Sequence, residues 1–149
     1  MKKNVIIILI DGGRLDFAEK SPIFKKLTPN IIQFNQSITY APYTTAAMHA
    51  VLSGCYGNRT GVNSYWNIYK FKNNNFLTLA DYLAEKNYYT YADGHTELII
   101  PKFGFREFNV HDEEKINLVE WHLELLDKMK SRYDNGENFF LYLHSSKLH

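Results

Sequence analysis

Continuous runs of apolar residues alternate along the chain with segments whose apolar residues recur at helical spacing. The run at residues 4–10 contains six consecutive aliphatic side chains, which is typical of a strand buried on both faces of a parallel sheet. Shorter runs at 88–92 and 139–143 predict two further buried strands. Residues 31–40 alternate loosely and are also compatible with a strand.

Four segments have the spacing or the end signals of helices: residues 22–27, 44–53, 78–86 and 113–132. In the second of these, we expect Thr44 or Thr45 to cap the start and Gly54 to end the helix. After the third, Asn87 is expected to adopt the left-handed conformation. Residues 58–75 are rich in Asn, Gly, Tyr and Lys without a clean period, and they predict a long loop.

Strands that alternate with helices predict an α/β fold with a mainly parallel sheet. A chain of 149 residues, of which 45% are hydrophobic, suits one domain with a sizeable core. The sequence stops directly after the third predicted strand, where open α/β sheets form their ligand crevice. We therefore expect residues 1–149 to be one domain, truncated at its C-terminal end.

Composition and charge exclude several classes of protein. The formal net charge of +1 argues against a protein that binds nucleic acid through electrostatic attraction. Cys55 is the only cysteine, so an internal disulfide is excluded. The apolar run after Met-Lys-Lys is too short for a signal peptide, and no segment reaches the about 20 apolar residues of a membrane span. We therefore expect a cytoplasmic protein without nucleic-acid or membrane partners.

Two residues have a side chain capable of metal binding or catalysis at a position where α/β proteins bind ligands. Asp11 follows the first predicted strand, where α/β proteins hold metal ligands and general bases, although a turn-forming Asp-Gly is the alternative. Thr44 stands at the start of a predicted helix, whose first amides attract phosphate or sulfate. Its hydroxyl can attack phosphorus when a metal lowers its pKa. For Thr44 taken alone, a helix cap is the alternative interpretation.

Three histidines and one arginine complete the candidate side chains. His95, His144 and His149 each follow a predicted strand, which places them near one edge of the sheet. Arg59 lies in a polar turn from which it can reach an anion, so we include it as a substrate-binding candidate. The remaining histidines are interpreted as structural: His49, His111 and His122.

These residues form part of a longer, ordered series of motifs. Ile-Asp-Gly-Gly-Arg at residues 10–14 ends the first strand, and Thr44 stands ten positions before Gly54. Further motifs follow at residues 56–62, 78–83, 88–90, 104–108 and 139–144, with His149 after them. Over essentially the whole chain, the series resembles the N-terminal part of the sulfatase and alkaline-phosphatase superfamily.

The resemblance implies an alkaline-phosphatase-like three-layer sandwich, of which this chain holds only the N-terminal part. It implies that Asp11 is a metal ligand, that Thr44 is both ligand and nucleophile, and that His95 and His149 lie on the substrate side. It also implies two divalent metal ions, with zinc favoured and manganese, magnesium or calcium as alternatives. The implied reaction is hydrolysis or transfer of a small-molecule phosphate or sulfate ester.

Three departures separate the chain from sulfatases. A sulfatase needs cysteine or serine at the nucleophile position to make formylglycine, and Thr44 cannot become that aldehyde. Gly12 replaces the second aspartate after the first strand, and Met48 replaces the arginine four residues past the nucleophile. These departures favour the threonine-using phosphodiesterase, phosphatase and phosphotransferase branch over hydrolysis of sulfate esters.

Two alternatives stay open. One is a sulfatase relative that acts on sulfate esters with an unusual nucleophile. The other is an inactive truncated fragment or a binding module, because the family's remaining metal ligands, including an Asp-His pair, lie in a second half of the fold. A second chain or that missing C-terminal half would then complete the site.

Overall fold

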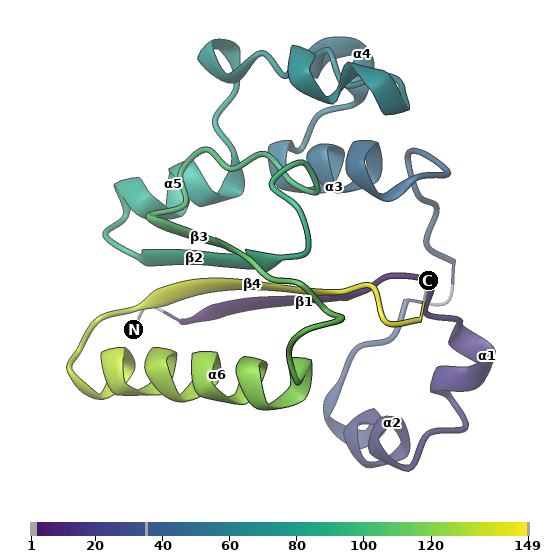
Figure 1. Ribbon diagram of the computed structural model, residues 1–149, viewed down its shortest axis with the longest axis vertical. Coiled ribbons are helices and arrows are strands. Elements are labelled where there is room, and N and C mark those ends of the chain that lie inside the picture. Colours follow the sequence, from purple (N-terminus) through teal and green to yellow (C-terminus); the bar gives the residue numbers. More distant parts are fainter. Residues whose placement is uncertain (1–2, 35, 149) are drawn as a thin grey trace.

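The computed structural model describes residues 3–34 and 36–148, in which four strands form one sheet (Figure 1). The strands are β1 (Val5–Ile10), β2 (Tyr89–Gly94), β3 (Glu107–Val110) and β4 (Phe139–Ser145). Their order in the sheet is β1-β4-β2-β3, and every neighbouring pair is parallel. The expected α/β class and mainly parallel sheet are therefore confirmed.

Helices cover both faces of this sheet and give the molecule three layers. The α-helices are α1 (Leu15–Ala18), α2 (Pro22–Leu27), α3 (Thr44–Ser53), α4 (Gly57–Thr60), α5 (Leu79–Glu85) and α6 (Leu118–Asp134). Three short 3₁₀ helices are η1 (Thr28–Asn30), η2 (Tyr65–Lys70) and η3 (Asn73–Asn75). In Figure 1, α3 and α5 lie on one side of the sheet and α6 on the other. This three-layer arrangement agrees with the predicted alkaline-phosphatase-like sandwich.

Alternate side chains of β4 enter two separate cores. Phe140 packs on one face with Leu52 of α3 and Leu83 of α5. Leu141 packs on the opposite face with Met129 of α6. Because β4 is a central strand with helices on both sides, its apolar run is buried on both faces, as its sequence predicts.

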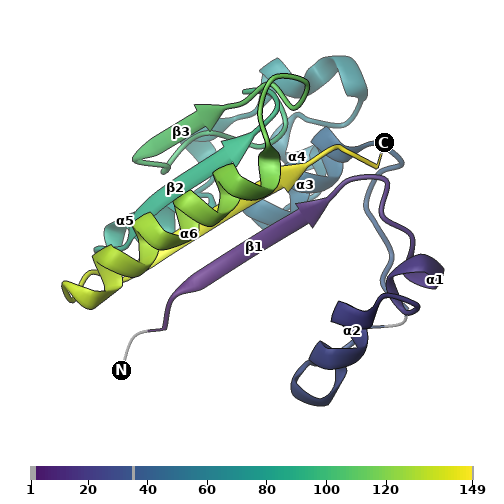
Figure 2. The same cartoon turned by 60° about the horizontal axis from the view of Figure 1, so that its bottom comes forward.

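The first strand departs from the expectation that it is buried on both faces. One face, which includes Ile7 and Leu9, packs against the core shared with α3 and α5. On the other face, Ile6, Ile8 and Ile10 are 45%, 60% and 55% exposed. β1 is an edge strand that pairs with β4, and α6 packs against β4 (Figure 2). The prediction was wrong for this face because an apolar run does not reveal where in a sheet the strand lies.

Other differences occur where the local sequence pattern is weak. Residues 31–34 and 36–40 contain no strand, so that interpretation was wrong. β3 was not predicted, since its four residues are only partly buried at the sheet edge. The expected loop over 58–75 holds two 3₁₀ helices and most of α4, and α6 begins at Leu118 instead of residue 113. Asn87 does adopt the left-handed conformation, with φ of 62°.

A search of the described residues finds no helix with the length and apolar character needed to cross a lipid bilayer.

Candidate functional site

Asp11 and Thr44, which are far apart in the sequence, lie in direct contact at the carboxyl ends of the strands. Asp11 follows β1 immediately, and its backbone N–H donates to the carbonyl of Ser145 at the end of β4, 2.8 Å away. Thr44 is the first residue of α3, and its Oγ1 donates to Asp11 Oδ2 at 2.9 Å. Parallel sheets of α/β proteins bind ligands beyond these strand ends. The contact therefore lies where a ligand is expected.

The Thr44 hydroxyl does not cap its own helix. Tyr43 occupies the cap position of α3 and makes no side-chain capping hydrogen bond, so the prediction that Thr44 or Thr45 caps the helix was wrong. The Thr45 hydroxyl is buried and has no hydrogen-bond partner among the described residues. At the other end, Gly54 has φ of 63° and ends the helix, as predicted. Because the first amides of a helix lack partners within it, they give this end of α3 positive character.

A cavity of about 720 Å³ opens in front of the Asp11–Thr44 pair. Its wall also includes His95 from the segment after β2, Ser146 from the segment after β4, and Tyr65 from η2. A carboxylate, hydroxyls and an imidazole thus face one space. The volume lies in the usual range for small-molecule sites, about 300–1,000 Å³.

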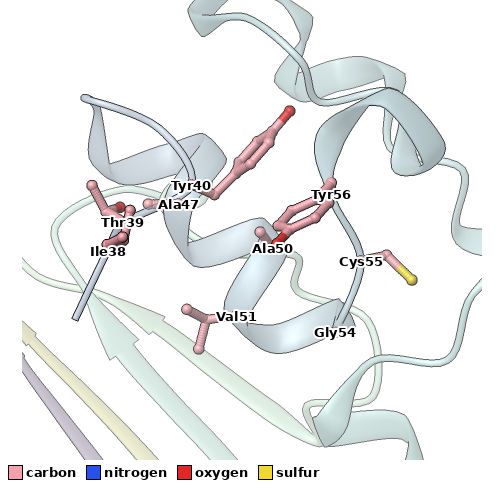
Figure 3. Close-up of a pocket in the computed structure, with 9 residues that line it drawn as sticks. All are labelled: Ile38, Thr39, Tyr40, Ala47, Ala50, Val51, Gly54, Cys55 and Tyr56. Carbon is pink, nitrogen blue, oxygen red and sulfur yellow. The ribbon is translucent and has the colours of Figure 1, made fainter. Parts of the chain in front are cut away.

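A second cavity, of about 350 Å³, runs along α3 (Figure 3). The residues labelled in Figure 3 include Tyr40 and Tyr56, whose rings stack with their centres 5.2 Å apart, and Cys55. Carboxylates and imidazoles are absent from the described residues that line this cavity. We therefore place the candidate site at the larger cavity, where groups capable of acid, base and nucleophilic chemistry meet.

Two histidines stand next to the Asp11–Thr44 pair. His144, fully buried on β4, has its ring centre 4.9 Å from that of His95. Its Nδ1 lies 3.0 Å from the Tyr142 hydroxyl, and its Nε2 lies 3.9 Å from Asp11 Oδ2. Burial, with a smaller contribution from the neighbouring His95, lowers the pKa of His144 to about 4, although Asp11 acts to raise it. His144 is therefore neutral at pH 7.

The atoms gathered around Asp11 fit a divalent metal ion. Asp11 offers carboxylate oxygens, and Thr44 offers a hydroxyl oxygen 2.9 Å away. The buried Nε2 of His144 has no hydrogen-bond partner among the described residues and faces the same carboxylate. Oxygen and imidazole donors are the ligands that zinc prefers alongside thiolates, and oxygen donors suit magnesium, calcium and manganese.

The structure brings three of the predicted site residues together and leaves a fourth outside. Asp11, Thr44 and His95 all line the larger cavity. Arg59 is exposed on α4 and is not among the described residues of that cavity wall. His149 lies outside the described residues.

A second polar cluster surrounds Asp93, which is buried near the end of β2. Its Oδ1 accepts hydrogen bonds from Asn109 Nδ2 at 2.6 Å and Trp121 Nε1 at 3.0 Å. Its Oδ2 accepts one from His122 Nε2 at 3.0 Å and lies 2.7 Å from His111 Nδ1. Burial acts to raise the pKa of Asp93, but these hydrogen bonds outweigh it and hold the pKa below its usual value. No sequence motif links these positions, and both histidines were interpreted as structural.

The sequence matches the Sulfatase family model over residues 3–149. A search of curated proteins finds no match. Proteins with this domain are hydrolases of sulfate esters or related compounds and generally use a divalent metal ion. Since the match covers nearly the entire sequence, this chain belongs to the sulfatase family.

Proposed function

We propose that the protein is a metal-dependent ester hydrolase that uses Thr44 as its nucleophile and prefers phosphate esters to sulfate esters. The observation that carries the proposal is the 2.9 Å contact between Thr44 Oγ1 and Asp11 Oδ2 on the wall of one cavity. A threonine at the N-cap position turns its hydroxyl to the helix amides, but Thr44 lies one residue past that position. This hydroxyl is instead directed at a carboxylate on the end of a strand.

Asp11 Oδ2 and Thr44 Oγ1 are the atoms that would hold a metal ion. When bound there, a divalent ion supplies a positive charge that lowers the pKa of the hydroxyl and offsets the negative charge of the ester. From the family resemblance we propose two ions, zinc first, and we place His149 on the substrate side. The further ligands that two ions require would come from a second chain or from a C-terminal half of the fold.

In the proposed reaction, Thr44 Oγ1 forms a bond to phosphorus while the bond from phosphorus to the ester oxygen breaks. The hydroxyl proton, which is now hydrogen-bonded to Asp11 Oδ2, leaves Thr44 and passes to water in the cavity. His95, on the same cavity wall, donates a proton to the leaving oxygen. The free amides at the start of α3 stabilise the charge that develops on phosphate. Water then cleaves the phosphothreonine, releases phosphate and restores the Thr44 hydroxyl.

The preference for phosphate rests on three positions, Thr44, Gly12 and Met48, where the chain departs from the residues of sulfatases. Membership of the sulfatase family favours sulfate esters as the second candidate substrate. Parallel assays with an aryl phosphate, an aryl phosphodiester and an aryl sulfate distinguish the two. Faster turnover of either phosphate substrate supports our proposal, whereas turnover of the sulfate alone contradicts it.

Substitutions at Thr44 test the nucleophile. Thr44→Ala should lower kcat/KM for the preferred ester at least about 1,000-fold, because the reacting oxygen is lost. Thr44→Ser keeps a hydroxyl at the position and should retain measurable activity. Ser131→Ala is the matched control, since it removes an exposed hydroxyl on α6 and should behave like the wild type. Full activity of Thr44→Ala would rule out the proposed role.

A further inference from the structure

The side chains of Asp93, His111 and His122, which are of types that bind metal ions, lie close together. None of the three belongs to the Asp11–Thr44 pair. Asp93 comes from β2, His111 from the residue after β3, and His122 from α6. One ligand atom of each residue lies within 4.8 Å of those of the other two. The side chains of Asp93 and His111 are 0% and 2% exposed, and that of His122 is 16% exposed. The cluster is therefore already assembled and largely shielded from water.

The cluster contains one buried nitrogen, His111 Nδ1, that has no hydrogen-bond partner among the described residues. It lies 2.7 Å from Asp93 Oδ2, yet the contact lacks hydrogen-bond geometry. The same oxygen accepts the hydrogen bond from His122 Nε2 at 3.0 Å. Because buried polar atoms almost always have a partner, an unpaired ring nitrogen beside a carboxylate oxygen points to a ligand that both atoms would share.

The atoms of His111 and Asp93 that point away from the cluster have polar partners, as the ligands of metal sites do. His111 Nε2 faces Glu113 Oε1 at 3.4 Å, and a metal-bound histidine usually directs its second ring nitrogen to a carboxylate or carbonyl. Asp93 Oδ1 accepts hydrogen bonds from Asn109 and Trp121, which fixes the carboxylate with Oδ2 toward the histidines. These partners would orient the ligands before an ion arrives.

Two imidazoles and one carboxylate form a ligand set typical of transition metals. Zinc hydrolases use such a set and leave the fourth position to water, and the same combination binds iron(II) with open positions. Ligand atoms about 2.1 Å from an ion are about 3.0 Å apart in neighbouring octahedral positions and about 3.4 Å apart in a tetrahedron. The separations of 2.7 Å and 3.0 Å at Asp93 Oδ2 are close to these values.

One residue of the cluster, His111, borders a cavity. His111 and Glu113 line a cavity of about 480 Å³. His95 and Ser146 line both this cavity and the larger one that contains Thr44. The Ser146 N–H also donates to Glu113 Oε1 at 2.7 Å, which ties the segment after β4 to the cluster. One ligand of the cluster therefore borders a cavity whose wall is shared in part with the larger site.

We propose that Asp93, His111 and His122 bind one divalent transition-metal ion, with zinc as the first candidate. This site shares no ligand with the Asp11–Thr44 pair, so it does not depend on the proposed nucleophile. An ion bound here joins β2, the end of β3 and α6 through direct ligand bonds.

Zinc titration of the metal-free chain tests the proposal, with the other site removed by Asp11→Asn. Calorimetry should show that the Asp11→Asn protein binds one zinc ion. Adding His122→Gln should weaken that binding at least about 100-fold, since loss of a ligand costs more than loss of an outer partner. His122 is the most exposed of the three ligands, so this variant is the one best suited to remain folded. Circular dichroism of the variant measures whether it remains folded.

Nitrogen-15 NMR of the histidine rings gives a second readout, which needs no substitution at the cluster. Saturating zinc should shift the ring nitrogens of His111 and His122 in the Asp11→Asn protein and leave those of His49 in place. Unchanged resonances of His111 and His122, or equal zinc affinity with and without His122→Gln, would overturn the proposal. The cluster would then be a hydrogen-bonded network only. Zinc affinity is measured without substrate, so failure here is distinguishable from failure of the proposed hydrolysis.

Discussion

Asp93→Asn should destabilise the metal-free protein strongly, although the two side chains have the same shape. The carboxylate accepts hydrogen bonds on both of its oxygens, from Asn109 and Trp121 on one and from His122 on the other. An asparagine must place its NH₂ group, which is a donor, on one of these two sides. Whichever side it takes, a buried donor then faces another donor.

The size of the effect follows from the burial and charge of this group. Asp93 is 0% exposed, so a donor that loses its acceptor here stays buried and unpaired. One or two lost hydrogen bonds to a charged group, at about 1.5–3 kcal/mol each, cost about 1.5–6 kcal/mol. Since a domain of this size loses about 2–4 °C in Tm per kcal/mol, we expect Tm to fall by about 3–24 °C.

Urea and thermal unfolding, followed by circular dichroism at pH 7 with a chelator present, measure this loss. Asp127→Asn is the matched control, because Asp127 is exposed on α6 and its substitution should change stability by less than about 0.5 kcal/mol. Because the pKa of Asp93 is lowered in the fold, its contribution should be present at neutral pH and lost as the pH falls through that lowered pKa. A loss of less than about 1 kcal/mol for Asp93→Asn would refute the reasoning about paired donors.

Two further predictions concern the fold and its pH dependence. Gly104→Ala should cost more than about 2 kcal/mol in urea unfolding, because φ is +79° and the added Cβ would lie 2.0 Å from the Asp81 backbone nitrogen. Gly136→Ala, with φ of +84° but open space around it, should cost only about 1 kcal/mol, and equal losses would contradict the steric argument. Stability should decline as the pH falls from about 6.5 toward 4. In the unfolded protein His144 takes up a proton near pH 6.5, whereas in the folded protein burial lowers its pKa to about 4. The free energy of unfolding should fall by up to about 3 kcal/mol in the wild type and by less in His144→Gln. Identical pH profiles of the wild type and His144→Gln would contradict a lowered pKa at His144.

The order and type of most elements could be predicted because they are encoded locally. The apolar run at residues 139–143 predicts a central strand, and the helix at 78–86 begins with a hydrogen-bonded cap at Thr78. The exposed face of β1 could not be predicted, since the same run of isoleucines suits an edge or a central strand. Position within a sheet depends on pairing with distant segments, which local periodicity does not contain.

The two polar clusters differ in how far the sequence reveals them. Asp11 and Thr44 could be selected because one ends a strand and the other begins a helix, which are positions that open toward a ligand. The Asp93 cluster depends on the pairing of β2 with β3, in which Asp93 and Asn109 are direct partners. Because β3 is short and was not predicted, nothing in the sequence placed His111 beside Asp93.

The most direct test of Thr44 as the nucleophile is to identify the residue that becomes phosphorylated during turnover. The protein, supplied with zinc and an aryl phosphate substrate, is quenched in acid within one turnover, digested and sequenced by mass spectrometry. We predict phosphate on Thr44 and none on the adjacent Thr45, and no phosphothreonine at this segment in Thr44→Ala. Turnover without modification of Thr44, or phosphate on Thr45 instead, would contradict the proposed mechanism.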